Sequence, residues 1–171
     1  MLVTKIANRK MAAARIWRAG IGLVTAEQAW TEMVRDMPQN LPEPGDHGHD
    51  QTHAWGRIYW GGSLYCLLAH VGIRKATENR AGLREAVRAI NASGGNITVE
   101  WPLSQALEIG DRATGATFMS DLFMKMSSPS HAVDLRALWK QLGATRIKES
   151  VTLDRQAPLA GIRASILGRQ N

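Results

Sequence analysis

Apolar residues recur along most of this chain at the spacing of one face of an α-helix. The clearest case is residues 52–77, where Leu64, Leu67, Leu68 and Val71 stand at positions i, i+3, i+4 and i+7. Similar patterns between glycines and prolines predict the other helices. These cover residues 4–19, 25–37, 83–90, 101–112, 118–126, 134–143 and 157–168. Only residues 149–153, with the sequence ESVTL, resemble a strand.

Capping residues mark the ends of several predicted helices. The TAEQ segment that starts at Thr25 has the Thr-x-x-Gln spacing of a capping box, and Asp134 is placed as an N-cap. Gly143 follows a helical segment as a C-terminal stop, and Pro102 suits the first turn of its helix. Three prolines and two glycines predict a loop over residues 38–51.

Length and composition fit one globular domain. A chain of 171 residues can bury a hydrophobic core without disulfides or metal ions. Its hydrophobic fraction of 44% and charged fraction of 21% are ordinary values for a globular protein. We therefore expect an all-α fold, a compact bundle of seven or eight helices with at most one short strand, forming a single domain over residues 1–171.

The net charge of +6 comes almost entirely from a predicted basic N-terminal helix within residues 1–20. This segment has no acidic residue, and its cations are Lys5, Arg9, Lys10, Arg15 and Arg18. They account for five of the six net positive charges, so the rest of the chain is nearly neutral. At about 100° per residue the five cations spread around the helix instead of forming one stripe. Nucleic-acid binding is therefore not expected, because it requires a basic face.

No segment predicts a membrane span or an export signal. The longest uncharged run, Ile58 to Ile73, has 16 residues, whereas a span needs about 20 apolar residues. We expect this run to be a buried helix. The N-terminus lacks the continuous apolar core of a secretory signal, and the compartment stays open. The single cysteine, Cys66, excludes internal disulfides and a cysteine-based zinc cluster, and its apolar surroundings predict a buried side chain.

The segment HDQTH, His49 to His53, differs by one methylene from HExxH, the zinc motif of many metallopeptidases. In that motif two histidines one helical turn apart bind the metal, and the glutamate activates a water molecule. Here Gly48 and a proline-rich stretch precede His49, so no helix holds its ring in a fixed direction. We therefore expect an exposed loop, in which Asp50 or Thr52 caps the helix that follows.

A small metal-dependent hydrolase that uses His47, His49 and His53 stays an alternative, because neutral imidazoles close in sequence chelate transition metals. Other residues with chemical potential fit the core better. Tryptophan, methionine and histidine side chains at apolar helical positions pack more often than they bind ligands. The residues concerned are Trp17, Trp30, Trp139, Met119, Met124, Met126 and His70.

The segment RIYWGGSLYCLLAHVGIRKATENRAGLREAVRAI, residues 57–90, resembles the helical region that follows the zinc site in gluzincin aminopeptidases. The resemblance is closest to the glycyl aminopeptidase family and its bacterial relatives. It continues through ALEIGDRATG, DLRALWKQLG and APLAGIRASILG, starts near RAGIGLVTAEQAW, and covers about residues 18–168. The order and spacing of these short motifs carry it. The resemblance implies that the chain is the C-terminal helical part of a zinc metallopeptidase.

In that family a tyrosine near the start of the long helix donates a hydrogen bond to the oxyanion beside the zinc ion. Tyr59 occupies this position by resemblance, with Gly61 and Ser63 where the family usually has lysine and alanine. A phenol is protonated at neutral pH and can stabilise negative charge without carrying charge itself. The other interpretation is that Tyr59 anchors the helix through its hydroxyl. Gly61 and Gly62 each cost about 1 kcal/mol of helix propensity, which predicts a close-packed neighbour or a site that needs backbone proximity.

The resemblance places the zinc-binding HExxH helix before the matched region, and the chain begins at Met1 too late to contain it. We therefore expect a truncated or degenerate aminopeptidase-like protein that holds no metal and is inactive alone. The parent family acts on peptide substrates. The alternative is a free-standing helical protein-interaction module that uses the basic first helix or an exposed apolar face. An uncovered cleft wall would favour self-association.

Overall fold

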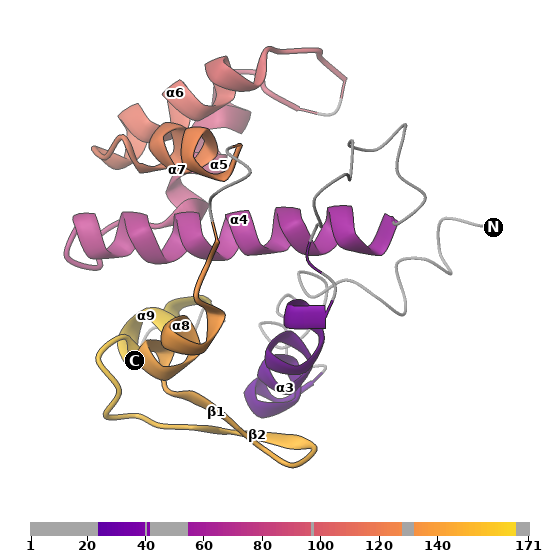
Figure 1. The fold of residues 1–171 in the computed structure, drawn as a ribbon. Helices are drawn as coiled ribbons and strands as arrows, with labels where there is room; N and C mark the ends of the chain where they lie inside the picture. The colour runs from indigo at the N-terminus through magenta and orange to yellow at the C-terminus, as the bar shows by residue number, and fades with distance from the viewer. Residues whose placement is uncertain (1–23, 40, 42–54, 97, 128–131, 167–171) are drawn as a thin grey trace. The chain divides into compact units, whose positions relative to one another are not determined.

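The computed structural model describes residues 24–39, 41, 55–96, 98–127 and 132–166 (Figure 1). The predicted helix over residues 4–19 lies outside these ranges, as does most of the loop predicted over residues 38–51. The helices described are α3 (Ala26–Asp36), the 3₁₀ helix η1 (Met37–Gln39), α4 (Trp55–Ala76), α5 (Leu83–Ala92), α6 (Leu103–Thr114), α7 (Phe118–Met126), α8 (Leu135–Leu142) and α9 (Ala160–Ile166). The prediction of a mostly helical fold is confirmed.

The expectation of at most one strand is wrong. Strand β1 (Ala144–Ile147) pairs antiparallel with β2 (Ser150–Leu153), with Ala144 opposite Leu153 and Ile147 opposite Ser150. Residues 149–153 were expected to form a strand, but a lone strand leaves its backbone groups unpaired, so a partner is required. The partner begins directly after Gly143 and is too short to show a pattern of its own. Lys148, with φ 54°, makes the tight turn between the strands.

The predicted caps are largely confirmed. The Thr25 hydroxyl accepts the Gln28 N–H, and the Gln28 side chain accepts the Thr25 N–H, which completes the capping box of α3. Asp134 accepts the N–H of Ala137 at the start of α8. Pro102 stands one position earlier than expected, as the residue that precedes α6. Its missing N–H costs nothing there, because the first amides of a helix have no partner within the helix.

The contacts divide the chain into two compact units, Met1–Leu64 with Val133–Asn171, and Tyr65–Ala132. The division falls inside α4, and each unit is described by itself below. The single domain expected over residues 1–171 stays a prediction. Among the described helices, none combines the length and the apolar character that a membrane crossing requires.

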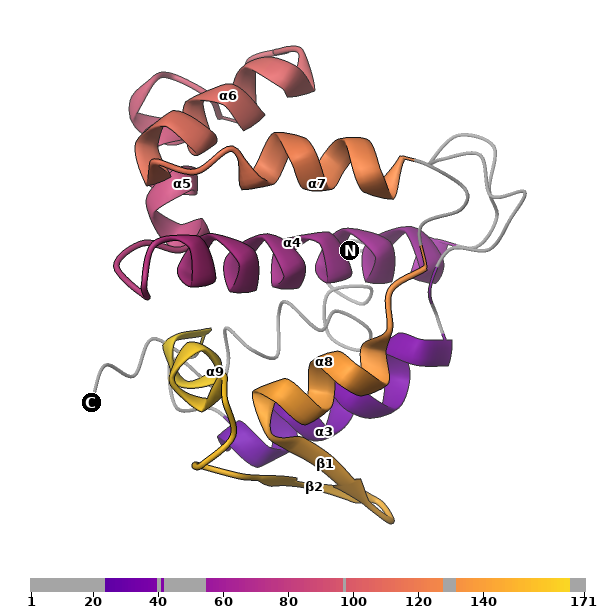
Figure 2. The ribbon, with the colours of Figure 1, turned by 60° about the vertical axis from the view of Figure 1, so that its left-hand side comes forward.

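In the first unit, α3 packs against both strands of the hairpin, and α8 contacts β1 and α9 (Figure 2). Trp30 of α3 and Trp139 of α8 meet edge to face, with ring centroids 6.1 Å apart and planes at 81°. Both are buried, as the sequence predicted. Neither indole N–H has an acceptor within the described residues. The pair is therefore held by ring packing and by burial of apolar area.

A buried arginine ties three elements of this unit together. The Arg163 guanidinium, on α9, donates to the carbonyl oxygens of Leu142 and Gly143 and to that of Asp154, 2.8 Å away. The first two carbonyls lie at the C-terminal end of α8, where a helix leaves such groups unpaired. Gly143 has φ 69°, and a Cβ there would lie 2.6 Å from the Asp154 oxygen, so only glycine fits this junction.

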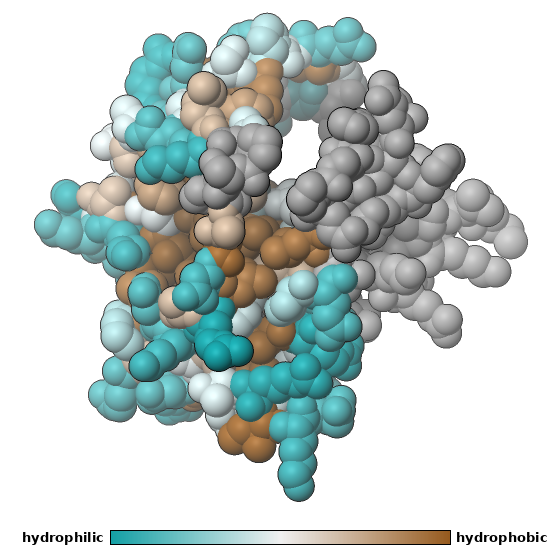
Figure 3. Space-filling model, viewed as in Figure 1, coloured by the Kyte–Doolittle hydropathy of each residue, from teal (hydrophilic) through white to brown (hydrophobic). Residues whose placement is uncertain are grey.

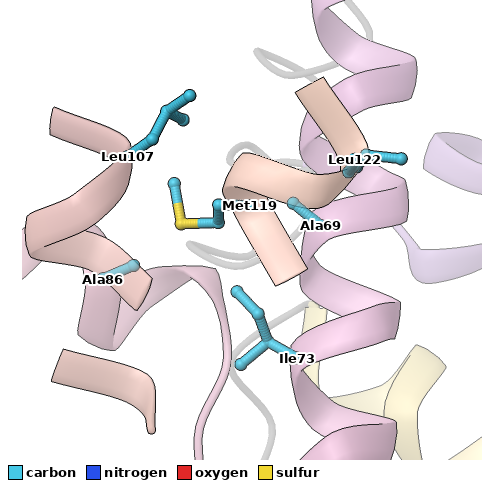
Figure 4. Packing of buried hydrophobic residues seen from close by; sticks show 6 residues of the cluster. All are labelled: Ala69, Ile73, Ala86, Leu107, Met119 and Leu122. Carbon is cyan, nitrogen blue, oxygen red and sulfur yellow. The ribbon is translucent and has the colours of Figure 1, made fainter. Parts of the chain in front are cut away.

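The second unit contains α4 from Tyr65 onward, together with α5, α6 and α7. Its core, shown in Figure 4, is formed by residues from all four helices: Ala69, Ile73, Ala86, Leu107, Met119 and Leu122. Gly72 and Gly110 allow the helices to approach closely. A Cβ at Gly72 would lie 2.1 Å from the ring of Phe118, and one at Gly110 would lie 2.8 Å from the Met119 sulfur.

The N-terminus of α7 is capped from a neighbouring helix. Thr117, at the N-cap position, makes no side-chain cap bond. Instead the buried carboxylate of Asp111, on α6, accepts the N–H groups of Met119 and Ser120 at 2.8 and 3.0 Å. The Tyr65 hydroxyl, on α4, donates to the Met119 carbonyl at 2.9 Å. Burial raises the pKa of Tyr65 to about 12, with the nearby Asp111 charge as a smaller cause.

Substitutions at two glycines of α4 should change stability in opposite directions. Gly72→Ala forces a methyl group against the Phe118 ring and should lower the free energy of unfolding by about 1–3 kcal/mol. Gly62→Ala has nothing within 4 Å of the new methyl group and should raise it by about 0.5–1 kcal/mol. Urea unfolding of both variants measures the difference. A Gly72→Ala variant as stable as the wild type would contradict the packing described.

Loss of the Arg163 guanidinium should destabilise the first unit. Arg163→Met keeps much of the side-chain volume but removes the donor of the Leu142 and Asp154 carbonyls, while the Gly143 carbonyl still accepts the Asp154 N–H; this should cost about 1–3 kcal/mol. Arg155→Met is the matched control, because Arg155 is exposed and makes no such bonds to the residues that the structure describes. Thermal unfolding of the two variants tests this, and equal melting temperatures would argue against the role of Arg163.

Candidate functional site

Tyr59 is the one candidate site residue that the structure describes. It lies in the second turn of α4 and is 36% exposed. Trp60 and Leu64, on the other side of the same helix, are buried. Because the helix presents successive residues about 100° apart, burial of Trp60 fixes which side of α4 carries Tyr59. The phenol is thus on the outer side of a helix whose inner side is packed.

The hydroxyl of Tyr59 is uncommitted within the described part of the chain, where no hydrogen bond to it is found. Its backbone carbonyl accepts the Ser63 hydroxyl at 2.8 Å, a bond within the helix that leaves the phenol unconstrained. The other tyrosine, Tyr65, behaves differently, since its hydroxyl is bound to the Met119 carbonyl. The anchoring role considered for Tyr59 is therefore carried by Tyr65.

Gly62 lies one turn after Tyr59, is exposed, and has open space where a side chain would begin. A close-packed neighbour was one expected reason for a glycine here. The described structure contains none, so that reason does not hold at this position. Ser63, the next residue, is partly exposed. The side of α4 around Tyr59 therefore carries small, uncharged residues, in contrast to the charged residues usual on an exposed helix face.

The histidines His47, His49 and His53 lie outside the described residues. Within the described ranges, no three His, Cys, Asp or Glu side chains come close enough to hold a metal ion. Cys66 is exposed on α4, contrary to the expected burial. Its apolar neighbours in sequence point to other sides of the helix, because residues of one apolar run are distributed around the axis.

His70 is a structural residue, as expected. Its Nε2 accepts the Nε–H of Arg74 at 3.0 Å, and the same guanidinium donates to the Asn79 carbonyl in the turn after α4. Burial lowers the pKa of His70 to about 4, and the Arg74 charge lowers it further, against a smaller effect of Glu85. The imidazole is therefore neutral at pH 7 and serves as an acceptor.

The methionines have different surroundings. Met119 is buried in the core and Met126 packs against it, as expected for packing residues. Met124 is 71% exposed, so the expectation that it packs in the core is wrong. Several apolar side chains reach the surface among hydrophilic ones (Figure 3), and the largest of these are Tyr59, Val87, Val99, Leu103, Phe123, Met124 and Ile147.

The structure shows a groove that the sequence did not predict. It lies between α5 and α6, has a volume of about 340 Å³, and is lined by Ala89, Ser93, Ile109, Arg112 and Ala113. The only signal for it in the sequence is a pair of alanines at outward positions of two helices. That signal is uninformative until the two helices are known to be neighbours.

No family model, curated protein or solved structure matches this chain. The resemblance to gluzincin aminopeptidases therefore stays a prediction.

Acidification should weaken the fold through His70. Its pKa is lowered in the folded protein, so the unfolded chain binds the proton first. The contribution of His70 to the free energy of unfolding is present in full above about pH 6.5. It is lost as the pH falls towards about 4. The expected loss is on the order of 1–2 kcal/mol. Between pH 5 and 7, carboxylates contribute little to the pH dependence of stability. The free energy of unfolding measured with urea should therefore fall with decreasing pH in the wild type, and His70→Gln should remove this slope. An unchanged slope in that variant would exclude His70 as its source.

Proposed function

We propose that this chain is the helical part of a zinc aminopeptidase-like protein, in which α4 presents Tyr59 to the substrate cleft. The observation that carries the proposal is the contrast between the two tyrosines. Tyr65 is bonded inside the core, whereas Tyr59 is partly exposed and its hydroxyl has no partner among the described residues. A donor that has no structural task is available for a substrate.

The chemistry of the phenol suits this role. Peptide hydrolysis passes through a tetrahedral intermediate whose oxygen carries negative charge, and a fixed hydrogen-bond donor lowers the energy of that state. A neutral phenol donates such a bond without attracting a counter-ion in the free enzyme. The helix supplies the fixed direction, because Trp60 and Leu64 are buried beside Tyr59 and hold this part of α4 in place.

The zinc ion of the proposed parent family would be held elsewhere. The described residues bring no three metal-ligating side chains together, so they do not fit a zinc site and we assign no zinc-dependent step to them. The contribution of this chain is limited to forming one wall of the cleft and to Tyr59. The chain alone is then expected to be inactive as a peptidase.

A second candidate function, a helical protein-interaction module, is supported by a different observation. Val87, Leu103 and Met124 expose apolar side chains on α5, α6 and α7. Exposed apolar side chains are common singly, and an interaction surface requires that several of them be contiguous. Light scattering at increasing protein concentration distinguishes self-association through such a face from monomeric behaviour.

The peptidase proposal is tested in the protein encoded by the whole reading frame. That frame should contain an HExxH segment upstream of the region described, and its product should release N-terminal residues from unblocked peptides in the presence of zinc. In this protein, Tyr59→Phe should lower kcat by about 10²–10³-fold and leave KM nearly unchanged, because the lost bond acts on the transition state.

Tyr65→Phe is the matched control. It removes the bond to the Met119 carbonyl, so it should lower the melting temperature and leave kcat close to that of the wild type. Full activity of Tyr59→Phe would remove the proposed role of this residue. The lack of an upstream HExxH segment in the frame would instead favour the interaction module.

A further inference from the structure

The hairpin of the first unit leaves the outer side of β2 without a backbone partner. The Asp154 N–H donates to the Gly143 carbonyl at 2.8 Å, so these two residues form a hydrogen-bonded pair of the antiparallel register. Hydrogen-bonded and non-bonded pairs alternate along such a register. Thr152 is therefore bonded to β1, whereas the N–H and C=O groups of Val151 and Leu153 point away from it. These groups form the free edge of β2, and no hydrogen bond to them is found among the described residues.

The helix that covers the hairpin lies on one of its faces. Both ribbon views show the hairpin at the lower end of the first unit, with α3 and α8 above it (Figures 1 and 2). Because side chains alternate along a strand, α3 packs on the face that carries the buried Val151. Thr152 points to the opposite face and is exposed. Within the described part of the chain, the free edge of β2 is thus open to another extended segment.

The free edge lacks the features that usually prevent strands from pairing. Sheet edges in natural proteins are commonly protected by a lysine, a proline or a bulge. Residues 150–153, with the sequence SVTL, contain no charge and no proline, and their register with β1 is unbroken. The nearest lysine, Lys148, lies in the turn before the strand. Pairing of this edge is therefore not opposed by its own residues.

The strand is complementary to itself in one antiparallel register. The free groups of two copies pair completely when Val151 of one copy lies opposite Leu153 of the other, because each N–H then meets a C=O. This register places Thr152 opposite Thr152 on a two-fold axis. Thr152 is exposed and uncharged, so the two copies meet there without repulsion.

The charges beside the strand fit the same register. Glu149, just before β2, faces Arg155 of the second copy, and the two-fold axis repeats this pair. Both side chains are exposed. Within its own chain, Glu149 makes only a long contact of 3.9 Å with the Arg146 guanidinium. Opposite charges that face each other across strands stabilise their pairing. This match of charges favours a second copy of the chain over an unrelated strand.

We infer that two copies of this chain associate through the free edge of β2. They form a continuous antiparallel sheet in the order β1-β2-β2-β1, with the two-fold axis at Thr152. The contact is short and smaller than the about 1,200 Å² of a stable interface, so the dimer is weak, with a Kd of about 0.1–1 mM. The inference goes beyond the proposed peptidase role, because Tyr59 takes no part in the contact.

Sedimentation equilibrium of the full chain, at concentrations around this Kd, tests the inference. Thr152→Lys places two like charges opposite each other on the axis and should weaken the dimer at least about 5-fold. Thr145→Lys is the matched control, because Thr145 is the exposed partner of Thr152 on β1, away from the free edge. It should leave the dimer unchanged. A chain that stays monomeric at about 1 mM, or equal effects of the two lysines, would overturn the inference.

Exchange of the two charges tests the register. Glu149→Arg and Arg155→Glu should each weaken the dimer about 5-fold or more, because like charges then face each other between the copies. The double variant restores opposite charges and should restore the dimer. If it stays as weak as the single variants, the proposed register is wrong.

Amide chemical shifts locate the contact. As the concentration rises, the amides of Val151 and Leu153 should shift, whereas that of Arg146, on the β1 edge, should not. Shifts confined to the β1 edge would contradict the inference. Val87→Ser should change nothing, and loss of the dimer in this variant would instead assign self-association to exposed apolar residues of the second unit. Tyr59→Phe should leave the dimer unaffected, so this test and that of the peptidase role fail independently.

Discussion

Burial of apolar side chains on two sides of α4 is the constraint on which this helix, and with it the rest of the structure, depends. The helix has no charged residue from Ile58 to Ile73 and contains glycines that weaken it. It therefore persists through packing: Trp60, Leu64, Leu67 and Val71 are buried along one side. Ala69 and Ile73, on the opposite side of the helix, are also buried, in the core of the second unit. The exposed residues of α4 include Tyr59, Gly62 and Cys66. An uncharged run of this length therefore still has an outer face.

Two buried charged residues complete the fold by binding backbone groups instead of opposite charges. Asp111 accepts two N–H groups at the start of α7, and Arg163 donates to carbonyls at the end of α8. In both cases a full charge of one sign meets the partial charge at a helix end, which is electrostatically favourable. Each also comes from a different helix, so the capping bond doubles as a link between elements. Local caps such as Thr25 lack this second effect.

The two tyrosines of α4 show how one residue type takes different roles by position. Tyr65 faces the core side of its unit and gives its hydroxyl to the Met119 carbonyl. Tyr59 lies nearly two turns earlier, faces outward, and keeps its hydroxyl available. The proposed role of Tyr59 starts from this contrast, because a polar group that the fold does not use is available for a ligand.

The sequence by itself determined the helices, because apolar spacing and capping residues act within a few residues of each other. The capping box at Thr25, the stop at Gly143 and the helix over residues 118–126 could all be predicted in this way. Only the tertiary structure decided the partner of the predicted strand, the exposure of Cys66, the cap from Asp111, and the groove between α5 and α6. Each of these depends on which distant segments become neighbours, and the spacing of residues along one helix contains no information on the surface that will face it.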